Sequence, residues 1–340
     1  MREKNPREKN PRKKILITGG AGFIGLHLAR RAADTCDVTL LDDFSRGRSD
    51  AELGALLGRV ELVEHDLTTP VPEGLLADDF AEVYHLAAVV GVAESNDNPR
   101  RVLRTNLLTT VHLLDWFSGL TGATLCFASS SEAYAGSVAA GIASVPTAED
   151  VPLMVPDLTV PRSSYGFSKI TGELLCRTYA RTHGFALRMV RFHNIYGPRM
   201  GYDHVIPQFI ERLLSGADPF EIHGADQTRA FCHVDDAVDA LIALTALPTK
   251  EPLLVNVGND QEEILIRDLA LGVFDAMGRY PAVDAHPAPP LSPARRLPDI
   301  SRLRELTGYS PAVPLSEGLR RTCEWYTHNP RDTAARGSGA

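Results

Sequence analysis

The chain has 340 residues, 44% of them hydrophobic and 23% charged, with a formal net charge of −8. This composition is that of a globular protein with room for about two domains, so it excludes a disordered chain and a fibrous repeat. The acidic balance disfavours a nucleic-acid partner, and no apolar run approaches the roughly 18 residues that cross a bilayer.

The amino-terminal segment is charged and has no apolar stretch behind it, unlike a secretory signal. We therefore expect a cytoplasmic protein, and we expect residues 1–12 and 331–340 to be flexible tails. The five cysteines are scattered and form no CxxC pair. We expect reduced thiols and no metal site.

Short apolar runs alternate with helix-length stretches in the first half of the chain. The predicted strands are residues 14–18, 38–41, 60–63, 82–86 and 123–127, with a first helix over residues 23–33. This alternation implies right-handed crossovers and a parallel sheet.

Beyond Pro198 the pattern changes, since residues 207–215 and 235–246 are predicted helical and the proline-rich residues 281–298 are predicted irregular. The predicted fold class is α/β, a doubly wound parallel sheet of the Rossmann type with a smaller α/β lobe. We place the dinucleotide-binding domain mainly in residues 13–197. The lobe lies mainly in residues 198–330, with some chain returning to the core.

Three glycines lie where the first predicted strand meets the first helix. Gly19, Gly22 and Gly25 have the spacing GxxGxxG, and Phe23 and Ile24 begin the helix. Without side chains, these glycines let the backbone approach a pyrophosphate, whose charge is stabilised by the amide groups and the positive end of the helix dipole. The motif predicts a dinucleotide site at this turn.

Acidic residues follow the next two predicted strands. Asp42 lies seventeen residues beyond Gly25, where a carboxylate can accept hydrogen bonds from both ribose hydroxyls of an adenosine. This favours NAD over NADP, although Arg46 and Arg48 are near enough in sequence to keep NADP open. Asp66 and Leu67 are predicted either to contact the adenine or to cap a turn.

Tyr165 and Lys169 are four residues apart, so on a helix their side chains project from one face. A nearby cation, together with a positive nicotinamide ring, favours phenolate and lowers the tyrosine pKa, which would let Tyr165 remove a hydroxyl proton. A serine run, residues 129–131, ends the fifth predicted strand at the edge where parallel sheets bind ligands. One of these hydroxyls is expected to bind the same substrate oxygen.

These features occur in one order along the chain. The order is the one found in extended short-chain dehydrogenases/reductases. It runs through the glycine turn, Asp42, the motif over residues 85–88, Asn106, the serine run, Tyr165 with Lys169, and the motif over residues 191–199. The chain resembles an NAD-dependent nucleotide-sugar epimerase/dehydratase from about Lys14 to Tyr326. The resemblance implies NAD as cofactor, a nucleoside diphosphate sugar as substrate and a homodimer built on the helices at residues 107–120 and 169–181.

The resemblance also assigns roles to single residues. Ser130 would contact the sugar 4-hydroxyl, Tyr165 would be the base, and Lys169 would hold the nicotinamide ribose. Asn106 would support the lysine through its helix, and Ala87 would line the cofactor site. The implied substrate-binding residues are Ser130, Ser131, Asn194, Val205, Arg229 and Arg296. Of these, the resemblance gives Arg229 and Arg296 the role of gripping the nucleotide diphosphate.

Two departures bear on the reaction. Ser131 replaces the aspartic acid of 4,6-dehydratases, which disfavours dehydration, whereas Glu132 is retained and also occurs in UDP-glucuronate decarboxylases. Ala135 replaces the usual glycine after Tyr134 and is expected to reshape the sugar pocket.

The predicted function is an NAD-dependent nucleotide-sugar 4-epimerase acting through a transient 4-keto sugar. One alternative is a nucleotide-sugar decarboxylase or dehydratase that uses Glu132. The other is a catalytically silent NAD-binding protein, because a fold does not dictate a function.

Overall fold

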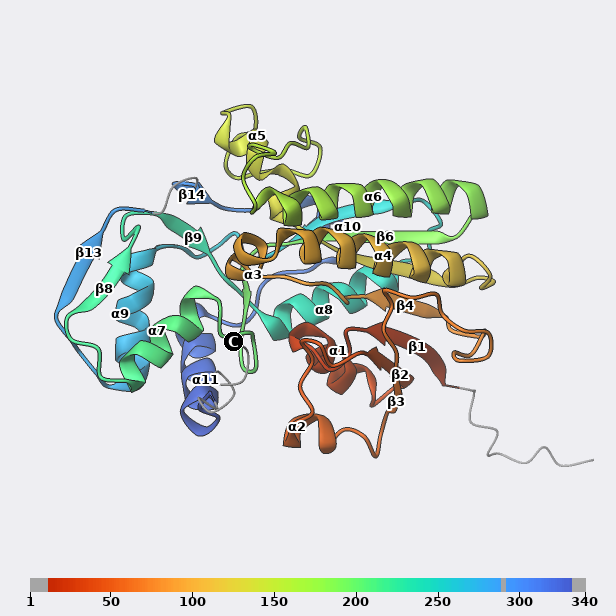
Figure 1. Ribbon diagram of the computed structural model, residues 1–340, viewed down its shortest axis with the longest axis horizontal. Helices are drawn as coiled ribbons and strands as arrows, with labels where there is room; N and C mark the ends of the chain where they lie inside the picture. Colours follow the sequence, from red (N-terminus) through yellow and green to blue (C-terminus); the bar gives the residue numbers. More distant parts are fainter. Residues whose placement is uncertain (1–11, 289–291, 332–340) are drawn as a thin grey trace, which may run out of the picture.

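The computed structural model describes residues 12–288 and 292–331. A seven-stranded parallel sheet forms the core, with the strand order β11-β6-β5-β4-β1-β2-β3. The strands are β1 (Lys13–Thr18), β2 (Cys36–Asp42), β3 (Glu61–Glu64), β4 (Glu82–His85), β5 (Thr124–Ser130), β6 (Ala186–Phe192) and β11 (Leu253–Val257). Figure 1 shows this core beside a smaller lobe. The predicted fold class is confirmed.

Helices cover both faces of the sheet because its strands are apolar on both faces. On one face, Ile15, Ile17 and Leu40 pack with α1 (Phe23–Ala32), α8 (Val234–Thr245) and α10 (Ser301–Thr307). On the other, Leu16 and Leu41 pack with α4 (Pro99–Phe117) and α6 (Ser163–His183). Neighbouring residues of one strand thus enter different cores, as strand geometry requires.

The lobe has its own apolar core and three main helices, α7 (Val205–Leu214), α9 (Ile266–Met277) and α11 (Leu315–His328). Two small sheets complete it. One pairs β8 (Phe220–His223) with β13 (Val283–His286), and the other joins β9 (Thr228–Ala230), β12 (Glu263–Leu265) and β14 (Arg295–Arg296). Its chain is discontinuous, since α8, β11 and α10 return to the core.

Short elements connect these parts. They are α2 (Ala51–Gly54), α3 (Val92–Asp97), the 3-10 helix η1 (Ser131–Tyr134), α5 (Ala135–Ala139), and the paired strands β7 (Ile195–Tyr196) and β10 (Cys232–His233). Figure 1 shows α5 and its flanking loops standing out from the body above η1.

The structure corrects one predicted element. Residues 281–298, predicted irregular, contain β13 and β14, because short parallel pairings with β8 and β9 satisfy their backbone between the prolines. Residues 289–291 of this segment, residues 1–11 and residues 332–340 lie outside the described part. Arg12, the first residue that the structure describes, donates hydrogen bonds to the carbonyls of Ala33 and Cys36, both 2.7 Å.

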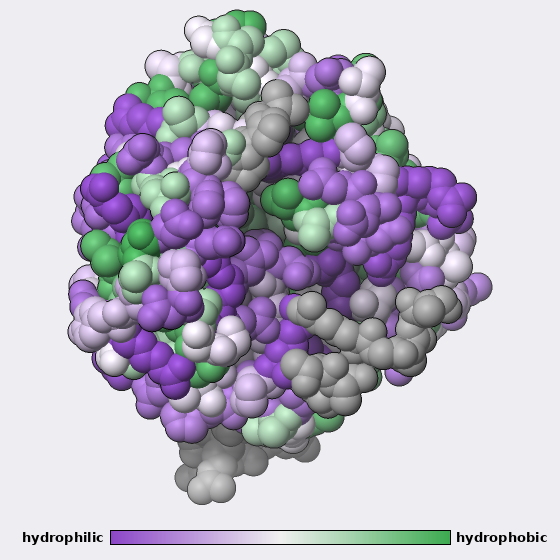
Figure 2. Space-filling model, turned by 60° about the vertical axis from the view of Figure 1, so that its left-hand side comes forward, coloured by the Kyte–Doolittle hydropathy of each residue, from purple (hydrophilic) through white to green (hydrophobic). Residues whose placement is uncertain are grey.

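Among the described residues, no helix combines the length and the apolar character that crossing a bilayer requires. The face seen in Figure 2 is mostly hydrophilic and carries only small, separated apolar patches.

Candidate active site

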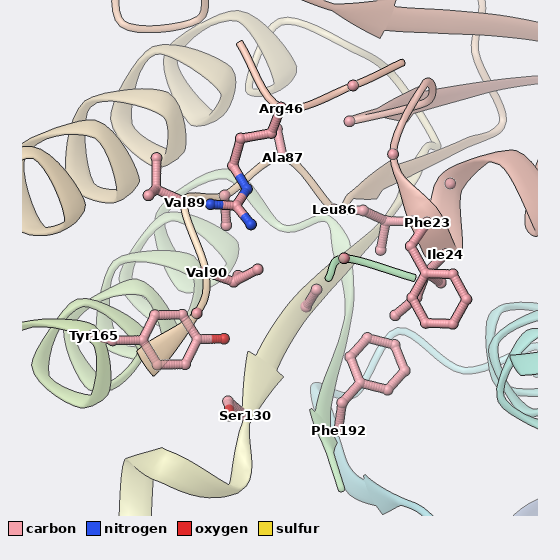
Figure 3. Close-up of a pocket in the computed structure, with 18 of the residues that line it drawn as sticks. Phe23, Ile24, Arg46, Leu86, Ala87, Val89, Val90, Ser130, Tyr165 and Phe192 are labelled. Carbon is pink, nitrogen blue, oxygen red and sulfur yellow. The ribbon is translucent and has the colours of Figure 1, made fainter. Parts of the chain in front are cut away.

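A cavity of about 480 Å³ lies at the carboxyl ends of the core strands, within the roughly 300–1,000 Å³ typical of ligand sites. Gly19 follows β1, Asp42 ends β2, Ala87 follows β4 and Ser130 ends β5, and all four line it. Figure 3 shows Tyr165 and Arg46 entering this cavity from different elements. Strands far apart in the sequence meet here because a parallel sheet presents all its carboxyl ends at one edge.

The glycine turn is a cradle that side chains would fill. Gly19 has φ +69°, and a Cβ there would lie 2.9 Å from the amide nitrogen of Ala87. A Cβ on Gly25 would overlap the carbonyl oxygen of Gly19. The amides of Phe23 and Ile24 begin α1, whose N-terminus has no side-chain cap, so they suit the diphosphate of a dinucleotide.

Asp42 is 7% exposed and lies beside this turn. Its two carboxylate oxygens accept hydrogen bonds from the amides of Ala21 and Phe44, both 2.9 Å. Burial raises the pKa of Asp42, and these amides oppose the rise. Each carboxylate oxygen has a further lone pair for a ribose hydroxyl, so the residues present fit NAD.

Asp66 and Asn106, both assigned to the cofactor site, lie outside the cavity lining, and for Asn106 this is the supporting position given to it from the sequence. Asp66 is exposed and does not line the cavity, because its carboxylate accepts from the amide and hydroxyl of Thr68, both 2.8 Å. Of the two alternatives for Asp66, the structure has the turn cap, whereas Leu67 lines the cavity. Asn106 is buried outside the lining, where it bonds to the backbone of Val89 and donates to the Ser168 hydroxyl over 3.1 Å. It therefore braces the helix turn that carries Lys169.

Tyr165 and Lys169 share one face of α6, with the ammonium 5.7 Å from the phenol ring centroid. Ser130 lines the cavity beside them, and its side chain caps η1 by accepting from the amide of Glu132 over 3.2 Å. Ser129 is the exception in the serine run, because it donates to buried Glu173, the partner of Arg191. The hydroxyl available to a substrate is thus that of Ser130 or Ser131.

The expected acidification of Tyr165 depends on Lys169 together with a nicotinamide ring, and the protein groups alone do not produce it. Burial raises the pKa of Tyr165 to about 12, while a hydrogen bond with Ser130 and the charge of Arg46 oppose the rise. The ammonium of Lys169 instead donates to the carbonyl of Ala128 over 2.8 Å, and burial lowers its pKa to about 8. The positive charge of a nicotinamide ring, which the prediction includes, would oppose the rise in the pKa of Tyr165.

A charged cluster lies next to this pair. Glu132 accepts hydrogen bonds from Arg162 over 3.0 Å and from Arg296 over 2.7 Å, and all three residues line the cavity. Burial alone would raise the pKa of Glu132, but the two guanidinium groups outweigh it and hold the pKa at about 2. Glu132 is therefore an ionised carboxylate, and the three side chains carry one net positive charge.

The remaining substrate assignments divide into two groups. Ser131 and Asn194 line the cavity, and Asn194 donates to the carbonyl of Ala230 over 2.8 Å. Val205 and Arg229 do not line it, and their assignment to the substrate stays a prediction. Val205 packs on the lobe core, and the guanidinium of Arg229 donates to the carbonyls of Thr228 and Pro293, both 2.7 Å.

The sequence assignment missed several lining residues. Arg162, His204 and Arg199 all line the cavity. Arg162 lies three residues before Tyr165 and directly precedes α6, so its spacing from Tyr165 was a usable signal. His204 directly precedes α7, and Arg199 closes the motif over residues 191–199 without having been given a role.

Within residues 12–288 and 292–331, no group of three or more His, Cys, Asp or Glu side chains is arranged to hold a metal ion.

Comparison with protein families agrees with this geometry. The model of the NAD dependent epimerase/dehydratase family matches residues 15–258. UDP-glucuronic acid decarboxylase 1 of Xenopus tropicalis is 33% identical over 319 residues, covering 92% of this chain and 72% of the relative. UDP-glucose 4-epimerase of Mycolicibacterium smegmatis is also 33% identical over 319 residues, covering 92% and 98%.

Solved structures show the same architecture. UDP-glucuronic acid 4-epimerase from Bacillus cereus, in complex with UDP-glucuronic acid and NAD, aligns with a TM-score of 0.81 at 27% identity. The alignment covers 93% of this chain and 99% of the epimerase. Similarity thus extends to enzymes of two reaction types on related substrates.

Proposed function

The chain belongs to the NAD dependent epimerase/dehydratase family, and from that premise we propose that it decarboxylates a nucleoside diphosphate uronic acid. The observation that carries the proposal is the cluster of Glu132 with Arg162 and Arg296 beside Ser130 and Tyr165. Its net positive charge suits a sugar with a carboxylate at carbon 5.

The arginines bind and orient the uronate. Guanidinium groups hold carboxylates through paired, charge-assisted hydrogen bonds. Because Glu132 already neutralises one of the two positive charges, the substrate carboxylate is held by a single net charge. A cluster with one net positive charge, rather than two, stabilises the bound carboxylate less, so less ground-state stabilisation is lost when the carboxylate leaves.

Tyr165 and Ser130 act at the 4-hydroxyl. NAD, which the glycine turn and Asp42 would hold, would supply reversible hydride transfer at carbon 4 and so allow a transient ketone there. Tyr165 accepts the hydroxyl proton, and its phenol and the Ser130 hydroxyl then donate hydrogen bonds to the ketone oxygen. The bond between carbon 5 and the carboxylate breaks, and carbon dioxide leaves. The electron pair of that bond stays with the sugar and forms an enolate with the 4-ketone, which these two donors stabilise.

A proton then adds to carbon 5, and Tyr165 returns its own proton to the 4-oxygen. The resting Glu132 carboxylate, with a pKa of about 2, is not an acid that supplies the carbon-bound proton. We assign that proton to solvent and Glu132 to orienting the two arginines. The same low pKa makes Glu132 unsuited to protonate a leaving hydroxyl, so dehydration is not proposed.

A second candidate is 4-epimerisation, the function predicted from the sequence. It is favoured by the similarity to UDP-glucuronic acid 4-epimerase and requires only Ser130, Tyr165 and NAD. This candidate shares the oxidation step but keeps the carboxylate. The silent alternative is not supported, because Ser130, Tyr165 and Lys169 are all retained in the site.

Products formed in deuterium oxide separate the candidates. The protein is incubated with UDP-glucuronic acid, and with UDP-glucose as the neutral control, and products are read by mass and proton NMR. Decarboxylation predicts a UDP-pentose lacking carbon dioxide and carrying deuterium at carbon 5. A product of unchanged mass, inverted at carbon 4 and free of deuterium, would establish epimerisation instead.

We also propose a homodimer formed through α4 and α6, which pack side by side in Figure 1. Leu174 on α6 is 64% exposed, although Leu114 on α4 is buried. Sedimentation of the wild type and of Leu174→Glu tests this. A monomeric wild type would contradict the proposal.

A further inference from the structure

Arg199 is a buried arginine that the proposed chemistry does not use. It follows β7 and Pro198 in the connection to the lobe, is 2% exposed, and has a left-handed φ of +69°. That conformation is unfavourable for a residue with a side chain and persists only where the surroundings hold it. Its side chain must therefore be fixed by strong contacts.

Those contacts join three segments of the cofactor end. The Arg199 guanidinium donates to the carbonyls of Ala21 and Gly22 over 2.8 and 3.0 Å. It also donates to the carbonyl of Arg48 over 3.0 Å and to the carboxylate of Asp50 over 2.8 Å. With its donors engaged in this way, the group is occupied by the protein rather than free to grip a phosphate.

The contacts with the glycine turn set the direction of its peptide groups. In a trans peptide the carbonyl of one residue and the amide of the next point in opposite directions. Because Arg199 holds the Gly22 carbonyl, the Phe23 amide is turned away from the guanidinium. Phe23 and Arg199 both line the cavity, and this amide opens α1 at the place suited to the cofactor diphosphate.

The loop at residues 46–50 is also bonded to Ala21. Arg48 donates its amide to the Ala21 carbonyl over 3.2 Å, while the Ala21 amide bonds to Asp42. Ala21 thus links the glycine turn, the ribose-binding carboxylate and the loop before α2. Arg199 closes this network from the side of the lobe, through Ala21, Arg48 and Asp50.

We propose that Arg199 is a positioning residue for NAD, which presets the glycine turn and the loop at residues 46–50 before the cofactor binds. The inference rests on the NAD dependence of the family and not on which reaction follows. Preorganised donors bind more tightly because the cost of ordering them is met in the free protein. Loss of Arg199 should therefore weaken NAD more than it weakens a uridine nucleotide.

Arg188 provides a matched control. It is 0% exposed and donates only to backbone carbonyls, including those of Leu244 and Thr249, but it lies outside the cavity lining. Arg199→Met and Arg188→Met each remove one buried guanidinium from its carbonyl partners. Both should lower the melting temperature, whereas only Arg199→Met should change cofactor affinity.

Calorimetric titration of cofactor-stripped protein with NAD, and separately with UDP, measures this. Arg199→Met should weaken NAD binding by about 10-fold or more, because the cost of ordering the glycine turn, about 1.4 kcal/mol, then falls on the binding step, with UDP binding changed less than about 3-fold. Bound NAD per chain in freshly purified protein should fall in parallel. Unchanged NAD affinity, or an equal loss in Arg188→Met, would overturn the proposal.

Two milder variants keep the test decisive if Arg199→Met does not fold. Asp50→Asn breaks the ion pair but keeps a residue that caps α2, so NAD binding should weaken by only about 3-fold. Arg199→Lys should recover part of the affinity, because an ammonium reaches fewer of the carbonyls. If both variants bind NAD as the wild type does, Arg199 has no positioning role.

Discussion

The cofactor end of the cavity is shaped by main chain, whereas the sugar end is shaped by charged side chains from distant segments. At the cofactor end, Gly19 to Gly25 form a contiguous turn whose carbonyls are held by Arg199. At the sugar end, Glu132, Arg162 and Arg296 come from η1, the start of α6 and β14. A turn of fixed geometry suits a cofactor common to a family, while exchangeable side chains suit a substrate that differs among its members.

Tyr165 lies where the two ends of the cavity meet, and its substitution is expected to have the largest effect on turnover. Tyr165→Phe removes the proton acceptor and should lower turnover at least about 100-fold, the usual size of a general-base effect. NAD and UDP binding should stay within experimental error of the wild type, since the phenol oxygen serves neither. Steady-state rates and titrations check this, and a variant with near-normal turnover would remove Tyr165 from the mechanism.

The cofactor end can be disturbed through its backbone. Gly25→Ala places a Cβ against the Gly19 carbonyl and 2.9 Å from Gly20 Cα, so we expect about 1–3 kcal/mol of destabilisation and a marked loss of bound NAD. Gly54→Ala is the control, because a Cβ there meets no atom within 4 Å. Denaturant unfolding and NAD content are the measurements. Equal NAD retention in both variants would contradict the cradle.

The sugar end can be disturbed through its charge. Arg296→Met should weaken UDP-glucuronic acid binding by about 10-fold relative to UDP-glucose, because a partly buried charge-assisted contact is lost. Arg295→Met is the neighbouring control, since Arg295 is paired with Glu263 and does not line the cavity. Competition binding gives both affinities. A parallel loss for the two sugars would mean that Arg296 does not read the carboxylate.

The smallest effect concerns pH. The pKa of Glu132 is lowered from 4.5 to about 2, so its ion pairs stabilise the fold above pH 4.5 and this stability is lost as the pH falls through 2. Glu132→Gln should therefore differ in stability from the wild type at pH 6 and converge with it in acid. Urea titrations across this range test it, and a constant difference would argue against the ion pairs.

Local patterns predicted the cofactor end well. The glycine spacing and the alternation of strands and helices placed Gly19, Gly25 and Asp42 in the cavity lining, because the signal is contained in a few neighbouring residues. Three residues assigned by motif alone, Asp66, Val205 and Arg229, lie outside the cavity lining. Each belongs to a matching segment, but its side chain is used by its own turn, by the lobe core or by nearby carbonyls.

By itself, the sequence determined the parallel Rossmann core, the NAD site and the shared helix face of Tyr165 and Lys169, since each follows from short-range periodicity and turn geometry. Only the tertiary structure decided the ionisation of Glu132, the raised pKa of Tyr165 and the partners of Arg199. These properties depend on burial and on charges brought together across more than a hundred residues. No local pattern encodes the distance between such groups, so folding had to supply it.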